Sequence, residues 1–158
     1  MDAQTGRLSA GAFIGPSLYR FEAAGTGVVM SPLVRFSPVP LVAIEASVPY
    51  FNYSRSFQIL GITAHSDGKA MMPELTVEGQ TPPALVRLSA GVGVGWALRL
   101  GGFAPSGAQL HLSGGIGVRV SGQSCVRGHV RRRTAVSGGY YMTDFAIGVE
   151  MVRRGRVN

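Results

Sequence analysis

The sequence has 158 residues, a length that suits one domain with a single core or one small barrel. Apolar residues make up 46% and charged residues 15%, which excludes a disordered chain, and no apolar run approaches the ~20 residues of a spanning helix. The net charge of +7 comes almost wholly from arginines placed one or two to a segment. This spacing is unlike the contiguous basic patch of nucleic-acid-binding proteins, so no nucleic-acid partner is expected.

Alternation of apolar residues with small or polar ones predicts eight extended strands. In the first half of the chain they cover residues 7–21, 28–37, 41–53 and 71–81. A more polar stretch, residues 54–70, is expected to form a long loop before the fourth strand. In the second half the strands cover residues 85–100, 108–121, 125–133 and 140–153. The clearest alternation runs from Val86 to Leu100, where every even-numbered residue is apolar.

Turns between consecutive strands contain Gly, Pro or Ser, which indicates hairpins joined in sequence order. The connections after the first, third, fifth and seventh strands are on balance the longer ones, so both termini are expected at the short-turn end, as in transmembrane barrels. We therefore predict an all-β fold: one eight-stranded antiparallel up-and-down transmembrane β-barrel over residues 1–158.

The two faces of the strands indicate which side is inside. The non-aliphatic face is rich in Gly and Ser, which fit a narrow lumen, and it carries charges of both signs, which a buried site must pair. Arg35 is expected opposite Glu45 across a hairpin, close enough to form an ion pair. The predicted lumen network comprises Arg35, Glu45, Glu74, Glu78, Arg87, Arg99, Arg119, Arg127, Asp144 and Glu150.

Aromatic residues cluster near the long-loop ends of the strands, where a membrane interface selects rings with one wet side. The expected interface residues are Tyr19, Tyr50, Trp96 and Tyr141. At the same end, the run Arg131-Arg132-Arg133 is a candidate site for lipid phosphates, which guanidinium groups bind bidentately.

A resemblance to a known group rests on three segments: Ser89-Ala90-Gly91-Val92-Gly93-Val94-Gly95, Leu112-Ser113-Gly114-Gly115-Ile116-Gly117-Val118-Arg119 and Asp144-Phe145-Ala146-Ile147-Gly148-Val149-Glu150-Met151. Together with the order of eight strands, they resemble the small bacterial outer-membrane β-barrel superfamily. The resemblance implies a place in the bacterial outer membrane and contact with its lipid. The first residues, 1–6, have neither the basic nor the apolar region of a signal peptide, so the chain is either not exported or numbered as a mature form with an added Met, and we expect the second. The last strand departs from the group's pattern, because it ends with Met151 and Arg153 where an aromatic residue is usual.

No phosphate loop, zinc spacing or nucleophile elbow is present, so no cofactor or metal is expected. His111 and Ser113 resemble the His-x-Ser element of outer-membrane lipid A deacylases, which makes a lipid A-modifying hydrolase one alternative. A soluble ligand-binding barrel, with its aliphatic residues inside, is another. The leading hypothesis is a non-enzymatic structural or interaction protein with a polar, closed lumen, which contacts another membrane or cell-surface protein through residues 54–70.

Overall fold

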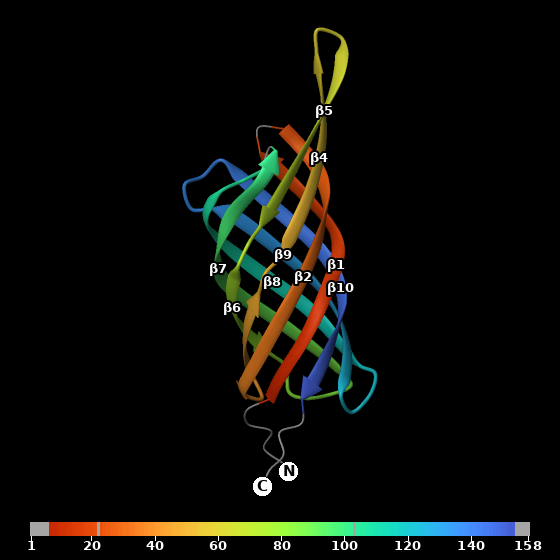
Figure 1. Cartoon of the computed structure of the whole chain (residues 1–158). Helices are drawn as coiled ribbons and strands as arrows, with labels where there is room; N and C mark the ends of the chain where they lie inside the picture. The colour runs from red at the N-terminus through yellow and green to blue at the C-terminus, as the bar shows by residue number, and fades with distance from the viewer. Residues whose placement is uncertain (1–6, 22, 103, 154–158) are drawn as a thin grey trace.

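The structure, a computed structural model, describes residues 7–21, 23–102 and 104–153. These residues form ten antiparallel strands: β1 (Arg7–Phe21), β2 (Ala23–Val39), β3 (Val42–Ser47), β4 (Tyr50–Ile59), β5 (Ile62–Met71), β6 (Glu74–Gln80), β7 (Val86–Gly102), β8 (Gly107–Arg119), β9 (Ser124–Ala135) and β10 (Tyr140–Arg153). β1 pairs with both β2 and β10, so the sheet closes into a barrel with β1 and β10 at its seam (Figure 1). Within the described ranges, no helix is long and apolar enough to span a membrane.

The barrel wall has eight strand positions, because two of them are each occupied by a pair of shorter strands that a proline separates. Pro49 separates β3 from β4, and Pro73 separates β5 from β6. Proline has no N–H to donate to a neighbouring strand, so the regular pairing stops at these residues. The carbonyl groups of both prolines still accept hydrogen bonds, from Met72 N at 2.9 Å and from Trp96 N at 3.1 Å. The wall is therefore continuous across each interruption, and the eight-stranded up-and-down prediction is confirmed.

The predicted loop 54–70 is wrong. β4 and β5 instead pair throughout this stretch, from Tyr50 opposite Met71 to Ile59 opposite Ile62. Beyond Ser54, β4 has left its other neighbour, β2, and the hairpin projects past the rim of the barrel as the yellow extension at the top of Figure 1. Backbone hydrogen bonds can hold such a hairpin together even when its side chains are polar. The polar composition of residues 54–70 is therefore compatible with a hairpin as well as with a loop.

β1 begins and β10 ends at the opposite end from this hairpin, which agrees with the end predicted for the termini (Figure 1). We call it the terminal end. The expected difference in loop length is wrong, however. At the terminal end the connections are residues 40–41, 81–85 and 120–123, and at the hairpin end those between described strands include the two-residue turn 60–61 and residues 136–139. The hairpin end differs from the terminal end because β4 and β5 extend past the rim there. We call it the loop end below.

Aliphatic side chains face outward around the wall, as predicted. Val92 is 59% exposed and Leu112 62% exposed, and Ile14, Ile116 and Ile147 are exposed as well. Away from the strand ends, the alternate residues on the same strands are buried or half-buried toward the lumen. A barrel in water would place these aliphatic groups in its interior. The soluble ligand-binding barrel is therefore contradicted.

Candidate functional site: the filled lumen and the projecting hairpin

A column of alternating charges runs through the lumen. Its members follow one another by ion pairs in the order Glu150, Arg35, Glu78, Arg127, Glu45, Arg131, Glu74, Arg133 and Asp144. All nine side chains are buried. Because each arginine lies between two carboxylates, no charge in the column is left without an opposite charge beside it, as burial requires.

The column joins opposite walls of the barrel. Arg127 and Arg131 belong to β9, whereas their partners Glu45 and Glu78 belong to β3 and β6. The Nη2 atom of Arg127 lies 2.6 Å from Glu78 Oε2, and its Nη1 atom lies 3.0 Å from Glu45 Oε2. Arg131 reaches Glu45 Oε1 at 2.5 Å and Glu74 Oε2 at 2.8 Å. An eight-stranded barrel is just narrow enough for side chains to meet in this way, so the lumen is filled and is not a wide pore.

Arg35 and Glu45 lie opposite each other in the β2–β3 register, but the predicted ion pair between them is wrong. Arg35 instead pairs with Glu78 at 2.7 Å and with Glu150 at 3.8 Å, and Glu45 pairs with arginines of β9. Neighbouring strands bring the backbones of such residues together. The long arginine side chain allows the guanidinium group of Arg35 to reach across the lumen to Glu78.

Three other arginines predicted for the network behave differently. Arg87 is half-buried and donates to Gln80 Oε1 at 3.3 Å. Arg99 and Arg119 are exposed near opposite ends of the barrel, so their assignment to the buried network is wrong. Arg99 donates to the backbone carbonyl of Ala104 at 2.8 Å. Both lie close to a strand end, where a long side chain reaches solvent.

The charge column holds four arginines and five carboxylates among the described residues. Arg7 and Arg87 are half-buried and line the lumen recess at the terminal end. The net charge of the whole chain is +7. This excess therefore comes from residues outside the column.

The arginine run at the end of β9 does not act as one group. Arg131 and Arg133 face the lumen and belong to the charge column, so their assignment to lipid phosphates is wrong. β9 continues to Ala135 instead of ending at residue 133, and alternation therefore carries through the whole run. Arg132 alone faces outward, with its Cζ atom 5.2 Å from the ring centroid of Tyr141.

The expected aromatic belt is only partly present. Trp96 and Tyr141 are exposed on the outer wall, and Tyr50 is half-buried on its outward face. Tyr19 is buried in the lumen, where its hydroxyl group donates to the carbonyl of Ser54 at 3.3 Å, so its assignment to the interface is wrong.

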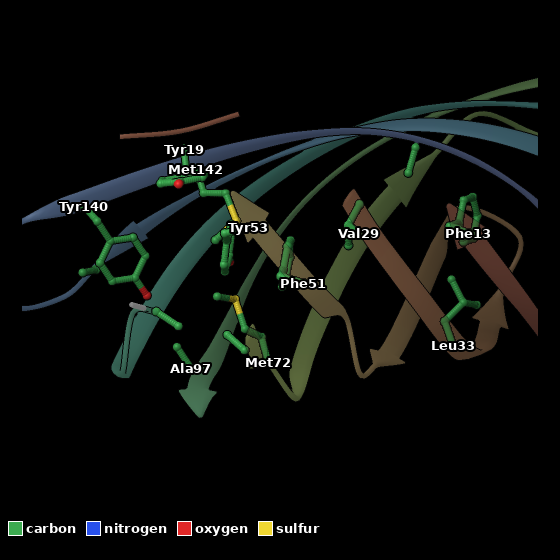
Figure 2. Packing of buried hydrophobic residues seen from close by; sticks show 14 residues of the cluster. Phe13, Tyr19, Val29, Leu33, Phe51, Tyr53, Met72, Ala97, Tyr140 and Met142 are labelled. Carbon is green, nitrogen blue, oxygen red and sulfur yellow. The ribbon is translucent and has the colours of Figure 1, made fainter. Parts of the chain in front are cut away.

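Aromatic and sulfur-containing side chains instead fill the lumen near the loop end. Tyr19 meets Tyr53 edge to face at 4.8 Å, and the Tyr53 ring stacks on Phe51 at 5.6 Å between ring centroids. Figure 2 shows Tyr53 between Met142 and Met72, with Phe51 beside it. We call this group the aromatic plug: Tyr19, Phe51, Tyr53, Met72, Ala97, Tyr140 and Met142. The sequence carries a signal for this plug. Phe51 and Tyr53 lie an even number of residues from Glu45, so alternation places them on the same, lumen-facing side of the strand.

His111 and Ser113 both face the lumen. His111 Nε2 lies 2.8 Å from Thr76 Oγ1, and Ser113 donates to Glu78 Oε1 at 3.4 Å. A hydrolase acting on membrane lipid would need this pair on the outer wall, where its substrate lies. Among the described residues, moreover, no group of three or more His, Cys, Asp or Glu could hold a metal ion.

The tip of the β4–β5 hairpin exposes apolar side chains. Leu60 is 98% exposed and Ile62 is 71% exposed. Leu60 and Gly61 have φ angles of 50° and 80°, which is typical of a type I′ turn. Asn, Asp or Gly usually occupies the first of these positions, and a leucine there is strained. Turn formation therefore does not explain the presence of leucine at this tip.

Comparison with known proteins supports the architecture. No protein-family model matches the sequence, and no curated protein matches it. Among solved structures, Neisserial surface protein A has a TM-score of 0.72 at 11% identity, covering 91% of this chain and 96% of that one. The fold is that of the small outer-membrane β-barrels. Ail, the attachment invasion locus protein of Yersinia pestis, has a TM-score of 0.62 at 12% identity, covering 95% of this chain and 100% of its own.

The N-terminal β-barrel domain of Pseudomonas aeruginosa OprF has a TM-score of 0.54 at 10% identity, covering 90% of this chain and 97% of that domain. All three structures are barrels of outer-membrane proteins, so the predicted resemblance is confirmed. Identities this low establish a shared fold and nothing about a shared ligand.

Proposed function

We propose that the chain is a bacterial outer-membrane β-barrel with a closed lumen, and that it uses the β4–β5 hairpin to bind a membrane or cell-surface protein. The observation that carries the membrane location is the polarity of the wall. Aliphatic side chains cover the outside, and every charge of the column lies inside. Such a barrel is stable when lipid surrounds the wall.

The hairpin is the best candidate for the binding surface. Beyond Ser54, the outer edge of β4 has no strand beside it in the described residues, and such edges readily pair with a partner's strand. The exposed side chains of Leu60 and Ile62 add an apolar contact, which a partner would bury in a pocket. The rigid barrel holds this surface beyond its rim, where a partner can reach it.

The hydrolase alternative receives no support from the site. His111 bonds to Thr76 and Ser113 bonds to Glu78, so each polar group serves the packing of the lumen. The plug lies between this pair and the loop end.

Membrane location is tested by cell fractionation, followed by gel migration with and without heating. We expect the chain in the outer-membrane fraction, soluble only with detergent, and running as a faster band before heating. Recovery of folded chain from the soluble fraction without detergent would contradict the proposal.

Partner binding is tested by placing a photo-crosslinking amino acid at Leu60 in intact cells. We expect a discrete adduct whose protein component, once purified, binds the chain and binds Leu60→Asp about tenfold or more weakly, the effect of losing one buried anchor residue. Val136 is the control position, because it is also exposed and apolar and lies in a loop at the same end. The same adduct from both positions, or equal affinity of the variant, would show that the hairpin is not the binding surface.

A further inference from the structure

Two outward arginines surround one tyrosine on the outer wall near the loop end. Arg20 is one residue from the end of β1 and lies opposite Tyr141 in the register with β10. Its Nη1 atom donates to the Tyr141 hydroxyl oxygen at 3.2 Å. Arg132 of β9 covers the face of the same ring, with its Cζ atom 5.2 Å from the centroid. We call Arg20, Tyr141 and Arg132 the outer arginine cluster.

The cluster has no carboxylate of its own in the part of the chain that the structure describes. Every ion pair there belongs to the column in the lumen, and neither Arg20 nor Arg132 takes part in one. The described acidic residue outside the lumen is Asp67, in the β4–β5 hairpin. The two guanidinium groups around Tyr141 therefore carry positive charge that no described carboxylate offsets, and a bound anion would neutralise it.

One member of the cluster, Arg132, also lines an apolar groove on the outer wall. Arg132 and Thr134 line one part of it, and the remainder is lined mainly by aliphatic side chains of β6, β7 and β8. Its volume is about 620 Å³, and its aliphatic residues are Leu75, Val77, Val92, Val94, Leu110 and Leu112. All six are exposed. A positive group on the lining of a hydrocarbon groove matches the two parts of a lipid that carries a phosphate.

We propose that the outer arginine cluster binds the phosphate of an anionic membrane lipid and that one acyl chain of that lipid lies in the groove. This inference rests on the proposed membrane location. Arg20 and Arg132 supply charged donors to the phosphate oxygens, and the Tyr141 hydroxyl, which accepts from Arg20, still has its own proton to donate. The acyl chain gains contact with the aliphatic walls of the groove.

The test is native mass spectrometry of the folded, detergent-solubilised chain with dioleoyl phosphatidylglycerol or dioleoyl phosphatidylcholine. We expect selective retention of phosphatidylglycerol by the wild-type chain. In the Arg20→Gln/Arg132→Gln variant, the affinity for this lipid should fall about tenfold or more, as expected for the loss of charge-assisted hydrogen bonds to phosphate. The affinity for phosphatidylcholine should change little.

Arg119→Gln is the matched control, because Arg119 is exposed at the terminal end of the barrel and its loss also removes a positive charge. Heat-modifiable migration of each variant confirms that it is folded, and failure of the wild-type chain in that assay would contradict the membrane location itself. Unchanged phosphatidylglycerol binding in the folded double variant would overturn the lipid site, as would an equal loss in Arg119→Gln. Displacement of the lipid by an equal concentration of inorganic phosphate would show an anion site without lipid specificity and would also overturn the proposal.

Discussion

The two ends of the lumen are filled by different chemistry. Toward the termini, ion pairs such as Arg35 with Glu78 hold the walls together, and the lumen opens into a recess of about 80 Å³. Toward the loop end, the aromatic plug closes the lumen with rings and sulfur atoms. Arg133 lies at the boundary, paired with Glu74 and Asp144 and 5.0 Å from the ring centroid of Phe51. Charged side chains require particular partners, whereas the plug requires shape and volume, so the two ends should respond differently to substitution.

Arg131→Met should have the largest effect, because it leaves Glu45 and Glu74 each with one arginine fewer inside the lumen. We expect a loss of about 3–5 kcal/mol in the free energy of unfolding, the usual result of removing one member of a buried ion pair. Urea unfolding in detergent measures it, and Trp96, the single tryptophan, reports the transition. Arg99→Met, at an exposed site, is the control, and an equal loss there would contradict the role of the column.

Met142→Ala tests the plug, where Met142 is fully buried beside Tyr53. A cavity of this kind should lower the free energy of unfolding by about 2–5 kcal/mol. Met142→Leu, which nearly conserves volume, should lower it by less than about 1.5 kcal/mol. If the two variants unfold at the same urea concentration, the plug does not depend on packing.

A double-mutant cycle between Arg35 and Glu78 measures the contact that replaced the predicted pair. Because the two groups are 2.7 Å apart, we expect a coupling energy of about 0.5–3 kcal/mol between Arg35→Met and Glu78→Gln. The same cycle between Arg35 and Glu45 should give a smaller value. A larger coupling for Glu45 would favour the pairing expected from the register alone.

Tyr53→Phe should have the smallest effect. It removes the hydroxyl group that donates to Met142 Sδ at 3.3 Å and keeps the ring, so a loss of about 0.5–1.5 kcal/mol in the free energy of unfolding is expected. Phe51→Tyr at the stacked ring is the companion variant. A loss for Tyr53→Phe as large as that for Met142→Ala would mean that polar contacts, and not packing, hold the plug.

Alternation predicted most of the architecture, because successive side chains of a strand point to opposite faces of the sheet whichever strands lie beside it. The assignment of Arg133 to lipid phosphates and of Tyr19 to the membrane interface rested on their position near a strand end. It gave too little weight to the alternation of faces along the strand. The parity of each residue places it in the lumen. The hairpin of β4 and β5 was missed because residues 54–70 lack a regular apolar face, and main-chain pairing leaves no trace in such a sequence.

The partner of each lumen charge was harder to predict than the face of the strand on which the charge lies. Register identifies residues on adjacent strands, as with Arg35 and Glu45. The observed partners of Arg127 lie on the opposite wall, and their distance depends on the diameter and tilt of the closed barrel. Neither quantity follows from alternation in a single sequence.

The charge column has a consequence for assembly. Its carboxylates come from β3, β6 and β10, and most of its arginines come from β9, near the end of the chain. A partly built sheet therefore carries Glu45 and Glu78 without the arginine that later joins them. We expect such an intermediate to keep this face hydrated until β9 arrives, so that expulsion of water and closure of the seam between β1 and β10 occur in one cooperative step.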